Sequence, residues 1–224
     1  MLSSRPKTMS HLQLKVSFFY SLSNIAVNWF FSTFYDFSTS GTGNIPPRGS
    51  AIIASNHVSF YDPPMIGAHA HRELSYLARD TLFKSLFGRI IRKLNAIPVA
   101  RGNADIKSLK AIFKTLNNKG AIVIFLEGSR SPDGKIGAPK PGIGMIACKS
   151  KAIIIPTRVF GAFEVFGRQK KLPSLGGPIH VAFGKPIKIE TIDPGKNHPE
   201  RYLEASQKIT AEVAKLKVPA YTVV

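Results

Sequence analysis

Residues 51–64 read AIIASNHVSFYDPP, in which an apolar run is followed by a polar loop and then by an aspartate and two prolines. A short apolar run bounded by polar residues is typical of a buried strand, and proline favours the first turn of a helix. The stretch therefore predicts a strand, a loop and a helix in succession. It also puts His57 and Asp62 in or beside the loop, where α/β folds place reactive groups.

The same alternation of short apolar runs and amphipathic runs continues along the chain. Strands are expected at residues 51–55, 74–78, 121–126, 152–160 and 179–183, with a shorter one around Ile97. Helices are expected at residues 63–70, 81–94, 104–116, 142–150 and 198–216, with Asn103 as the N-cap of the third. Strands separated by helices of this length predict an α/β fold, with a central mixed sheet flanked by helices.

The N-terminal segment has a different composition. Residues 16–35 contain no Asp, Glu, Lys or Arg and are rich in aromatic residues, while serine and asparagine recur at three- or four-residue spacing. On a helix this spacing gives a broad apolar surface with one polar stripe, which favours a helix or helical hairpin lying in one membrane leaflet. A single spanning anchor, a signal peptide and a core helix of a soluble domain are the alternatives.

This contrast divides the chain into three parts. Residues 1–37 are expected to form an N-terminal membrane-associated helical segment, residues 38–50 a linker rich in Gly, Ser and Pro, and residues 51–224 the α/β domain. Basic residues precede the segment and dominate the rest of the chain. The positive-inside tendency therefore places the domain on the cytoplasmic side of a membrane.

The chain carries 31 Lys and Arg against 13 Asp and Glu, a formal net charge of +18. Such a charge implies an anionic partner: nucleic acid, a phospholipid surface, an acidic protein or a phosphorylated substrate. Residues 72–114 hold ten of the basic residues and three acidic ones, and in the expected helix 81–94 the basic residues lie opposite an apolar face. A solvated helix face would carry mixed charges, so an anionic membrane or an acidic carrier protein is favoured.

Metal and nucleotide sites are not indicated. The single cysteine, Cys148, excludes an intrachain disulfide and a cysteine-cluster metal site, and the six histidines show no zinc-binding spacing. Residues 142–147 match a G-x-G-x-x-A dinucleotide pattern but follow Pro141 instead of a strand, and the P-loop pattern is missing. We therefore expect no metal and no bound cofactor.

His57 and Asp62 form the minimal general-base pair. If the loop brings the Asp62 carboxylate to the Nδ1–H of His57, the tautomer is fixed and Nε2 is free to accept a proton. Asp62 is also well placed to be the N-cap of the following helix, and the two roles are compatible.

Residues 125–131, FLEGSRS, stand at the exit of another expected strand. Arg130 is suited to a bidentate phosphate contact, Gly128 lets a ligand approach the backbone, and Glu127 could accept a hydrogen bond from a hydroxyl or brace the guanidinium. An ordinary turn is the alternative. Arg101 ends the short strand in a similar way.

In this order the blocks resemble those of the glycerolipid acyltransferases of the lysophosphatidate type. The family's N-H-x-S-x-x-D block is similar to residues 56–62, its arginine block to residues 99–101, and its F-P-E-G-T-R-S block to residues 125–131. Its block of apolar residues with proline is similar to residues 155–157. The likeness extends over about residues 50–185.

Three positions depart from the family pattern. Leu126 stands where the family usually has proline, Ser129 where it has threonine, and Thr157 where it has an apolar residue. None of these changes removes a charged or titrating group, so they bear on substrate preference more than on activity.

The resemblance implies transfer of a fatty acyl group from acyl-CoA or acyl-carrier protein to the sn-2 hydroxyl of 1-acyl-sn-glycerol 3-phosphate, forming phosphatidate. It implies His57 as the general base, oriented by Asp62. The residues implied to bind the phosphate and glycerol of lysophosphatidate are Arg101, Glu127, Gly128, Ser129 and Arg130. The region implied for the oxyanion or the acyl group is Ile155, Pro156 and Thr157.

Two other interpretations remain open. The same fold could acylate another acceptor, such as glycerol 3-phosphate or a different lysophospholipid, or the chain could be a basic domain that binds nucleic acid. Nucleic-acid binding explains the charge, but it explains neither the uncharged aromatic segment nor a His–Asp pair beside a Glu–Arg pair. We therefore expect lysophosphatidate, the acyl donor and an anionic membrane surface as partners, and no nucleic acid.

Overall fold

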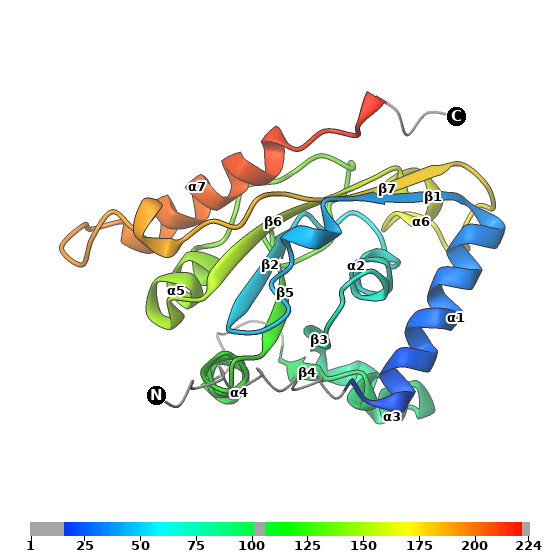
Figure 1. The fold of residues 1–224 in the computed structure, drawn as a ribbon, viewed down its shortest axis with the longest axis horizontal. Helices are drawn as coiled ribbons and strands as arrows, with labels where there is room; N and C mark the ends of the chain where they lie inside the picture. Colours follow the sequence, from blue (N-terminus) through cyan, green and yellow to red (C-terminus); the bar gives the residue numbers. More distant parts are fainter. Residues whose placement is uncertain (1–15, 101–105, 221–224) are drawn as a thin grey trace, which may run out of the picture.

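The structure is a computed structural model that describes residues 16–100 and 106–220. Its centre is one mixed sheet with the strand order β1-β7-β6-β2-β5-β3-β4 (Figure 1). The strands are β1 (Asp36–Ser40), β2 (Ala51–Ser55), β3 (Leu74–Arg79), β4 (Ala96–Val99), β5 (Ala121–Phe125), β6 (Ile153–Phe160) and β7 (Pro178–Phe183). Neighbouring strands are parallel except β6 and β7, which are antiparallel. The expected α/β class with a mixed sheet is thus confirmed.

Helices cover both faces of this sheet (Figure 1). They are α1 (Phe18–Phe34), α2 (Asp62–Ala68), α3 (Leu86–Lys93), α4 (Ile106–Asn117), α5 (Pro141–Ser150), α6 (Ala162–Phe166) and α7 (Arg201–Lys215), with short 3-10 turns η1 (Thr42–Asn44), η2 (Asp80–Lys84) and η3 (Ile189–Thr191). One core cluster joins α1 and α2 to the sheet, and a second joins α4, α5 and α7 to its other face.

β2 lies between the two core clusters and has both faces buried. Ile53 belongs to the cluster with α1 and α2, whereas Ile52 belongs to the cluster with α4, α5 and α7. A strand covered on both faces is apolar throughout instead of alternating. This explains why the sequence AIIA predicted the central strand so directly.

Strand β1 was not expected, because residues 38–40 were assigned to a linker. Residues 36–40 pair in parallel with β7 at one edge of the sheet. The strand reads DFSTS, and the Ser38 and Ser40 hydroxyls hydrogen bond to the two ring nitrogens of His180 at 2.8 and 2.9 Å. An edge strand that is held by polar contacts does not need alternating apolar and polar residues. The sequence pattern therefore gave no indication of this strand.

The helix expected over residues 81–94 is interrupted. Ser85 is extended, with φ −101° and ψ 173°, and separates η2 from α3. Gly88 fits tightly here, since a Cβ added to it would lie 2.5 Å from the Cα of Phe83. Several apolar side chains beside the break are exposed, among them Leu86 and Phe87. In the helix expected at 104–116, the proposed N-cap Asn103 lies outside the described residues.

α1 is a single helix that packs on the α/β domain. Phe31 is part of the core, and the Tyr20 hydroxyl accepts a hydrogen bond from the Leu74 backbone N–H at 3.0 Å. The polar stripe is turned partly inward, since the Asn28 side-chain amide donates to the Ala68 carbonyl at 3.1 Å. Within residues 16–100 and 106–220, none of the helices has the length and apolar character needed to cross a bilayer.

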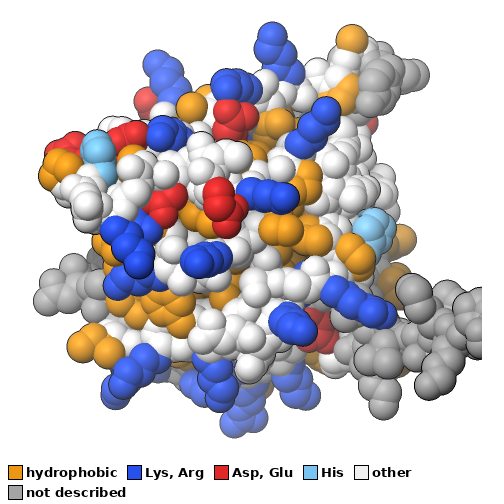
Figure 2. All heavy atoms as spheres, turned by 60° about the vertical axis from the view of Figure 1, so that its left-hand side comes forward, with side chains coloured by type: hydrophobic (Ala, Val, Ile, Leu, Met, Phe, Trp, Pro, Cys, Tyr) orange, Lys and Arg blue, Asp and Glu red, His pale blue; other side chains and the backbone are white. Residues whose placement is uncertain are grey.

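Basic side chains are spread over the face that is seen in Figure 2. On the side that carries α5, turned forward in Figure 2, Lys and Arg side chains are more numerous than Asp and Glu. The positive charge on this face is therefore not confined to one stripe.

Candidate active site

The loop after β2 holds His57 and Asp62 together. His57 Nδ1 and Asp62 Oδ2 are 2.7 Å apart. The same Asp62 oxygen accepts hydrogen bonds from the backbone N–H groups of Val58 at 2.7 Å and Ser59 at 2.8 Å. Asp62 is fully buried and is the first residue of α2. Its carboxylate therefore holds the loop and the imidazole, and it does not cap the helix as an N-cap side chain would.

The His57 ring is fixed on a second side by stacking on Phe125. The ring centroids are 3.8 Å apart and the planes differ by 12°. With Nδ1 donating to Asp62, Nε2 is left as a proton acceptor. The His57 side chain is 17% exposed, so this nitrogen belongs to a group that solvent or a ligand can reach.

Asn56 anchors the loop to the sheet. Its side-chain amide donates to the Val159 carbonyl at 3.0 Å, and its side-chain oxygen accepts from the Val159 N–H at 2.8 Å. The backbone N–H of Ser131 donates to the His57 carbonyl at 2.7 Å. This last bond brings the loop after β5 beside the loop after β2, so two blocks far apart in the sequence form one site.

Glu127 lies in the loop after β5 and is largely buried. One of its oxygens accepts from the Gly137 N–H at 3.4 Å, while Oε2 is buried with no hydrogen-bond partner among the described residues. Burial, with a smaller contribution from the nearby Asp62, raises the pKa of Glu127 from 4.5 to about 7. A carboxyl group with this pKa is partly protonated near neutral pH and can then donate a hydrogen bond as well as accept one.

Gly128 gives the loop its turn. Its φ of +68° lies in the left-handed region, and a Cβ added there would come 3.2 Å from the Lys140 side chain. Glycine adopts this conformation without strain. Ser129 follows as an exposed residue, so the chain turns outward between Glu127 and Arg130.

Arg130 faces the same loop cluster. Its guanidinium carbon lies 3.3 Å from the centre of the Phe60 ring, and Phe60 packs on Phe166 with centroids 4.8 Å apart. The Nη1 atom of Arg130 is buried without a hydrogen-bond partner in the described part of the chain. Burial lowers the pKa of Arg130, and the nearby Arg168 and Arg79 lower it further. Arg168 and Arg79 repel the charge of Arg130, and an anion bound beside Arg130 would stabilise it.

Sequence reasoning missed the aromatic support of this arginine and the two neighbouring cations. Phe60 occupies a variable position of the N-H-x-S-x-x-D block, and Phe166 lies in α6, which was not expected. Arg79 ends β3 at the same edge of the sheet as the loops after β2 and β5, because these three strands are parallel. The position of Arg79 at a strand end was a usable signal, whereas the Phe60 stack depends on the tertiary fold.

Two expected parts of the site, residues 155–157 and Arg101, stay predictions. Residues 155–157 lie within β6, where they pair with residues 53–55 of β2 and are buried in the sheet. The Thr157 hydroxyl donates to the Ile155 carbonyl at 3.2 Å, so it is occupied locally. Arg101 lies outside the described residues. Residues 16–100 and 106–220 contain no group of three or more His, Cys, Asp or Glu side chains arranged to hold a metal ion.

The geometry combines an oriented histidine with an arginine that has an unpaired donor. His57 can take a proton at Nε2 while Asp62 stabilises the resulting imidazolium. Arg130 presents an unused donor to a phosphate or carboxylate. The site is therefore suited to activating a hydroxyl on a substrate that also carries a negative charge.

The sequence profile of a family described as Acyltransferase matches residues 36–159. Among curated proteins, the chloroplast 1-acyl-sn-glycerol-3-phosphate acyltransferase of Arabidopsis thaliana is 24% identical over 158 residues, which cover 69% of this chain and 44% of the relative. The 1-acyl-sn-glycerol-3-phosphate acyltransferase of Bacillus subtilis is 29% identical over 145 residues, which cover 62% of this chain and 71% of the relative. The matched region thus spans less than half of the plant relative.

A similar fold occurs in a solved structure. The crystal structure of the 1-acyl-sn-glycerophosphate acyltransferase PlsC from Thermotoga maritima superposes with a TM-score of 0.69 at 24% identity. The superposition covers 90% of this chain and 79% of that chain. The mixed sheet with its flanking helices is therefore shared between the two proteins.

Proposed function

The chain belongs to the Acyltransferase family, as its sequence blocks indicated, and from this premise we propose a specific reaction. It transfers a fatty acyl group from a thioester to the sn-2 hydroxyl of 1-acyl-sn-glycerol 3-phosphate, which yields phosphatidate. The observation that carries the proposal is the hydrogen bond between His57 and Asp62 beside the unpaired donor of Arg130. The names of the plant and bacterial relatives support the choice of acceptor.

The chemistry needs one base and no covalent enzyme intermediate. His57 Nε2 takes the proton of the sn-2 hydroxyl as the hydroxyl oxygen attacks the thioester carbonyl carbon. The tetrahedral intermediate collapses, the carbon–sulfur bond breaks, and the leaving thiolate takes the proton back from the imidazolium. Asp62 stabilises the positive charge on the imidazole during the step.

The acceptor is held by its phosphate and glycerol groups. Arg130 binds the phosphate through its free Nη1 donor, and the family resemblance adds Arg101 to the same role. Glu127 bonds an oxygen of the glycerol phosphate beside Gly128 and Ser129. Holding the acceptor in this way places its hydroxyl against the base, which lowers the entropy cost of reaction.

The donor is acyl-CoA or acyl-carrier protein, and the reaction takes place at an anionic membrane surface on the cytoplasmic side. The contact with a membrane is supported by α1, whose residues Phe18, Leu22, Ile25 and Trp29 are exposed at spacings of four, three and four. They form one apolar stripe on the side of the helix turned away from the domain. No bound cofactor or metal is required for the transfer.

The test uses purified protein with labelled acyl-CoA and acyl-carrier protein, a panel of acceptors and separation of products by lipid class. Labelled phosphatidate is expected from lysophosphatidate with at least one donor, and its rate of formation is expected to fall by at least about 10²-fold in the His57→Ala variant. Label that enters only glycerol 3-phosphate, or only a lysophospholipid without a terminal phosphate, would overturn the proposed acceptor. The absence of transfer from either donor to any acceptor would overturn the reaction.

A further inference from the structure

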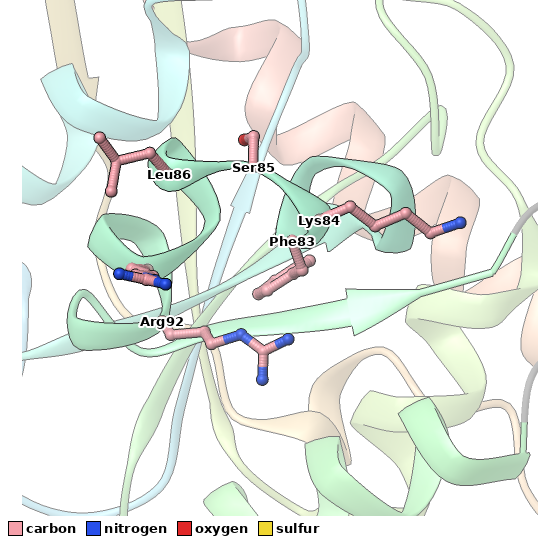
Figure 3. A pocket seen from close by; sticks show the side chains of 6 residues that line it. Phe83, Lys84, Ser85, Leu86 and Arg92 are labelled. Atoms are coloured by element: carbon pink, nitrogen blue, oxygen red, sulfur yellow. The ribbon is translucent and has the colours of Figure 1, made fainter.

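A basic hollow lies between η2 and α3, apart from the residues of the candidate active site. It encloses about 370 Å³ and is lined by Phe83, Lys84, Ser85, Leu86, Arg89 and Arg92. In Figure 3 the Phe83 ring lies between the Lys84 and Arg92 side chains. The hollow exists because extended Ser85 separates two short helical pieces.

The cations of this hollow lack acidic partners. In the described part of the chain, no Asp or Glu side chain forms an ion pair within 4.0 Å with Lys84, Arg89 or Arg92. The nearest acid in sequence, Asp80, accepts a hydrogen bond from the Thr81 N–H instead. Like charges gathered around one hollow repel each other, and a bound anion relieves this repulsion.

Apolar side chains flank the cations and are exposed. Leu86 is 74% exposed and Phe87 is 54% exposed, and Leu82 and Ile90 are also exposed. Residues 86, 87 and 90 share one side of α3. An exposed apolar patch with a polar rim marks an interaction surface, and a bilayer interface satisfies both parts of it.

This surface continues onto α1. The N-terminal end of α1 lies beside α3 in Figure 1, and the Lys93 ammonium is 5.2 Å from the centre of the Phe19 ring. The exposed stripe of α1 begins at Phe18 and Leu22. The N-terminal end of the α1 stripe is therefore a neighbour of α3.

We propose that the hollow between η2 and α3 binds the phosphate of one anionic phospholipid headgroup while Leu86 and Phe87 enter the same leaflet. The inference rests on the proposed function only in placing the enzyme at a membrane. A nucleotide could neutralise the cations, but it would leave the apolar side chains in water. An acidic protein could cover both the cations and the apolar side chains, and the competition experiment below distinguishes it from a membrane. Because η2 follows the carboxyl end of β3, the lipid holds the sheet edge that carries His57 and Glu127 at the interface.

The headgroup contact is tested by vesicle binding. Arg89→Gln/Arg92→Gln removes two charges from the hollow, and Lys110→Gln/Lys114→Gln removes two exposed charges from α4, which lies apart from α3 in Figure 1. Binding to phosphatidylcholine vesicles is measured with and without phosphatidylglycerol. The hollow variant is expected to bind anionic vesicles about thirtyfold more weakly, and the α4 control by less than about threefold. Equal losses in the two variants would overturn a specific site.

The apolar contact has its own matched pair. Leu86→Gln/Phe87→Gln is compared with Leu172→Gln/Leu175→Gln, which changes two exposed leucines far along the chain. The first pair should weaken binding to neutral and anionic vesicles alike, because insertion does not depend on lipid charge. The second pair should change neither. Unchanged vesicle binding by the first pair would contradict insertion at α3.

Competition identifies the source of the anion. Soluble glycerol phosphate, inorganic phosphate, CoA and acyl-carrier protein are each added to the protein bound on anionic vesicles. If acyl-carrier protein or CoA binding falls in Arg89→Gln/Arg92→Gln while vesicle binding is unchanged, the hollow is a donor site and the proposal is wrong. Activity on short, soluble lysophosphatidate should be equal in all variants, and its absence in the unaltered protein would contradict the proposed function without affecting the vesicle result.

Discussion

The guanidinium carbon of Arg130 lies 3.3 Å from the centre of the Phe60 ring. The two residues come from loops after different strands, and Phe60 is itself tied to α6, since its N–H donates to the Phe166 carbonyl at 3.3 Å. The aromatic ring covers one face of the cation and leaves the Nη1 donor without a hydrogen-bond partner in the described part of the chain. Phe60 therefore positions the group that we assign to the acceptor phosphate.

Replacing the ring should weaken acceptor binding selectively. Phe60→Leu is expected to raise the KM for lysophosphatidate by roughly three- to thirtyfold, which corresponds to a cation–π contact, and to leave the KM for the acyl thioester unchanged. Phe60→Tyr keeps the ring and serves as the matched control. Adding Phe60→Leu to Arg130→Ala should cause little further loss, because the stack is already gone. Additive effects in this double variant would show that Phe60 acts independently of Arg130.

The assigned base is tested by His57→Ala. Because Asp62 keeps its bonds to the Val58 and Ser59 backbone N–H groups, the variant should stay folded and keep its vesicle binding while kcat falls on the order of 10²–10⁴-fold. A well-folded variant that turns over near the normal rate would remove His57 from the mechanism.

The Asp62→Asn variant removes the negative charge of the side chain and keeps its shape, so it tests the charge of Asp62 apart from its hydrogen bonds. Asp62 Oδ2 accepts bonds from His57 and from two backbone N–H groups, so an amide oxygen at the same place can retain the loop. The imidazolium then lacks its counter-charge, and kcat should fall by at least about 10²-fold, while both KM values stay within about threefold. Thermal melting in parallel distinguishes this loss from unfolding. Normal kcat in the folded variant would show that the carboxylate only supports the loop.

Local sequence was enough to predict β2, the loop and α2, because an apolar run and two prolines act within a few residues. Block order was enough to gather His57, Asp62, Glu127 and Arg130 at one edge of the sheet. Contacts that depend on the whole fold were not predictable, including the Phe60 stack and the polar edge strand β1. The role of residues 155–157 stays a prediction, since this block is buried in β6, where Thr157 pairs with Ser55, two residues before His57.

Glu127 should make stability depend on pH. Its pKa is raised from 4.5 to about 7 by burial, so between these values the unfolded chain releases the proton that the folded chain keeps. The contribution of Glu127 to folding stability therefore falls as pH rises from about 4.5 to about 7. Above about pH 7 this contribution no longer changes with pH. Glu127→Gln removes the effect. The difference in Tm between Glu127→Gln and the unaltered protein should grow in favour of the variant over this range. A constant difference would mean that the Glu127 pKa is not raised.

The two faces of α1 are expected to have different roles: the inward face contributes to folding stability, and the exposed face contributes to membrane binding. Phe31 is part of the core, so Phe31→Ala should cost about 3–5 kcal/mol of unfolding free energy, measured by denaturant titration. Ile25 and Trp29 are exposed, so Ile25→Gln/Trp29→Gln should change stability by less than about 0.5 kcal/mol.

The outward pair should instead weaken binding to neutral vesicles by about 100-fold or more, because two large apolar side chains are lost from the interface. Deleting residues 16–37 would remove both faces together, so loss of membrane binding in that form would be confounded with unfolding. The paired substitutions avoid this difficulty. If Ile25→Gln/Trp29→Gln binds vesicles as the unaltered protein does, the exposed stripe of α1 is not a membrane surface, because those two side chains supply much of its apolar area.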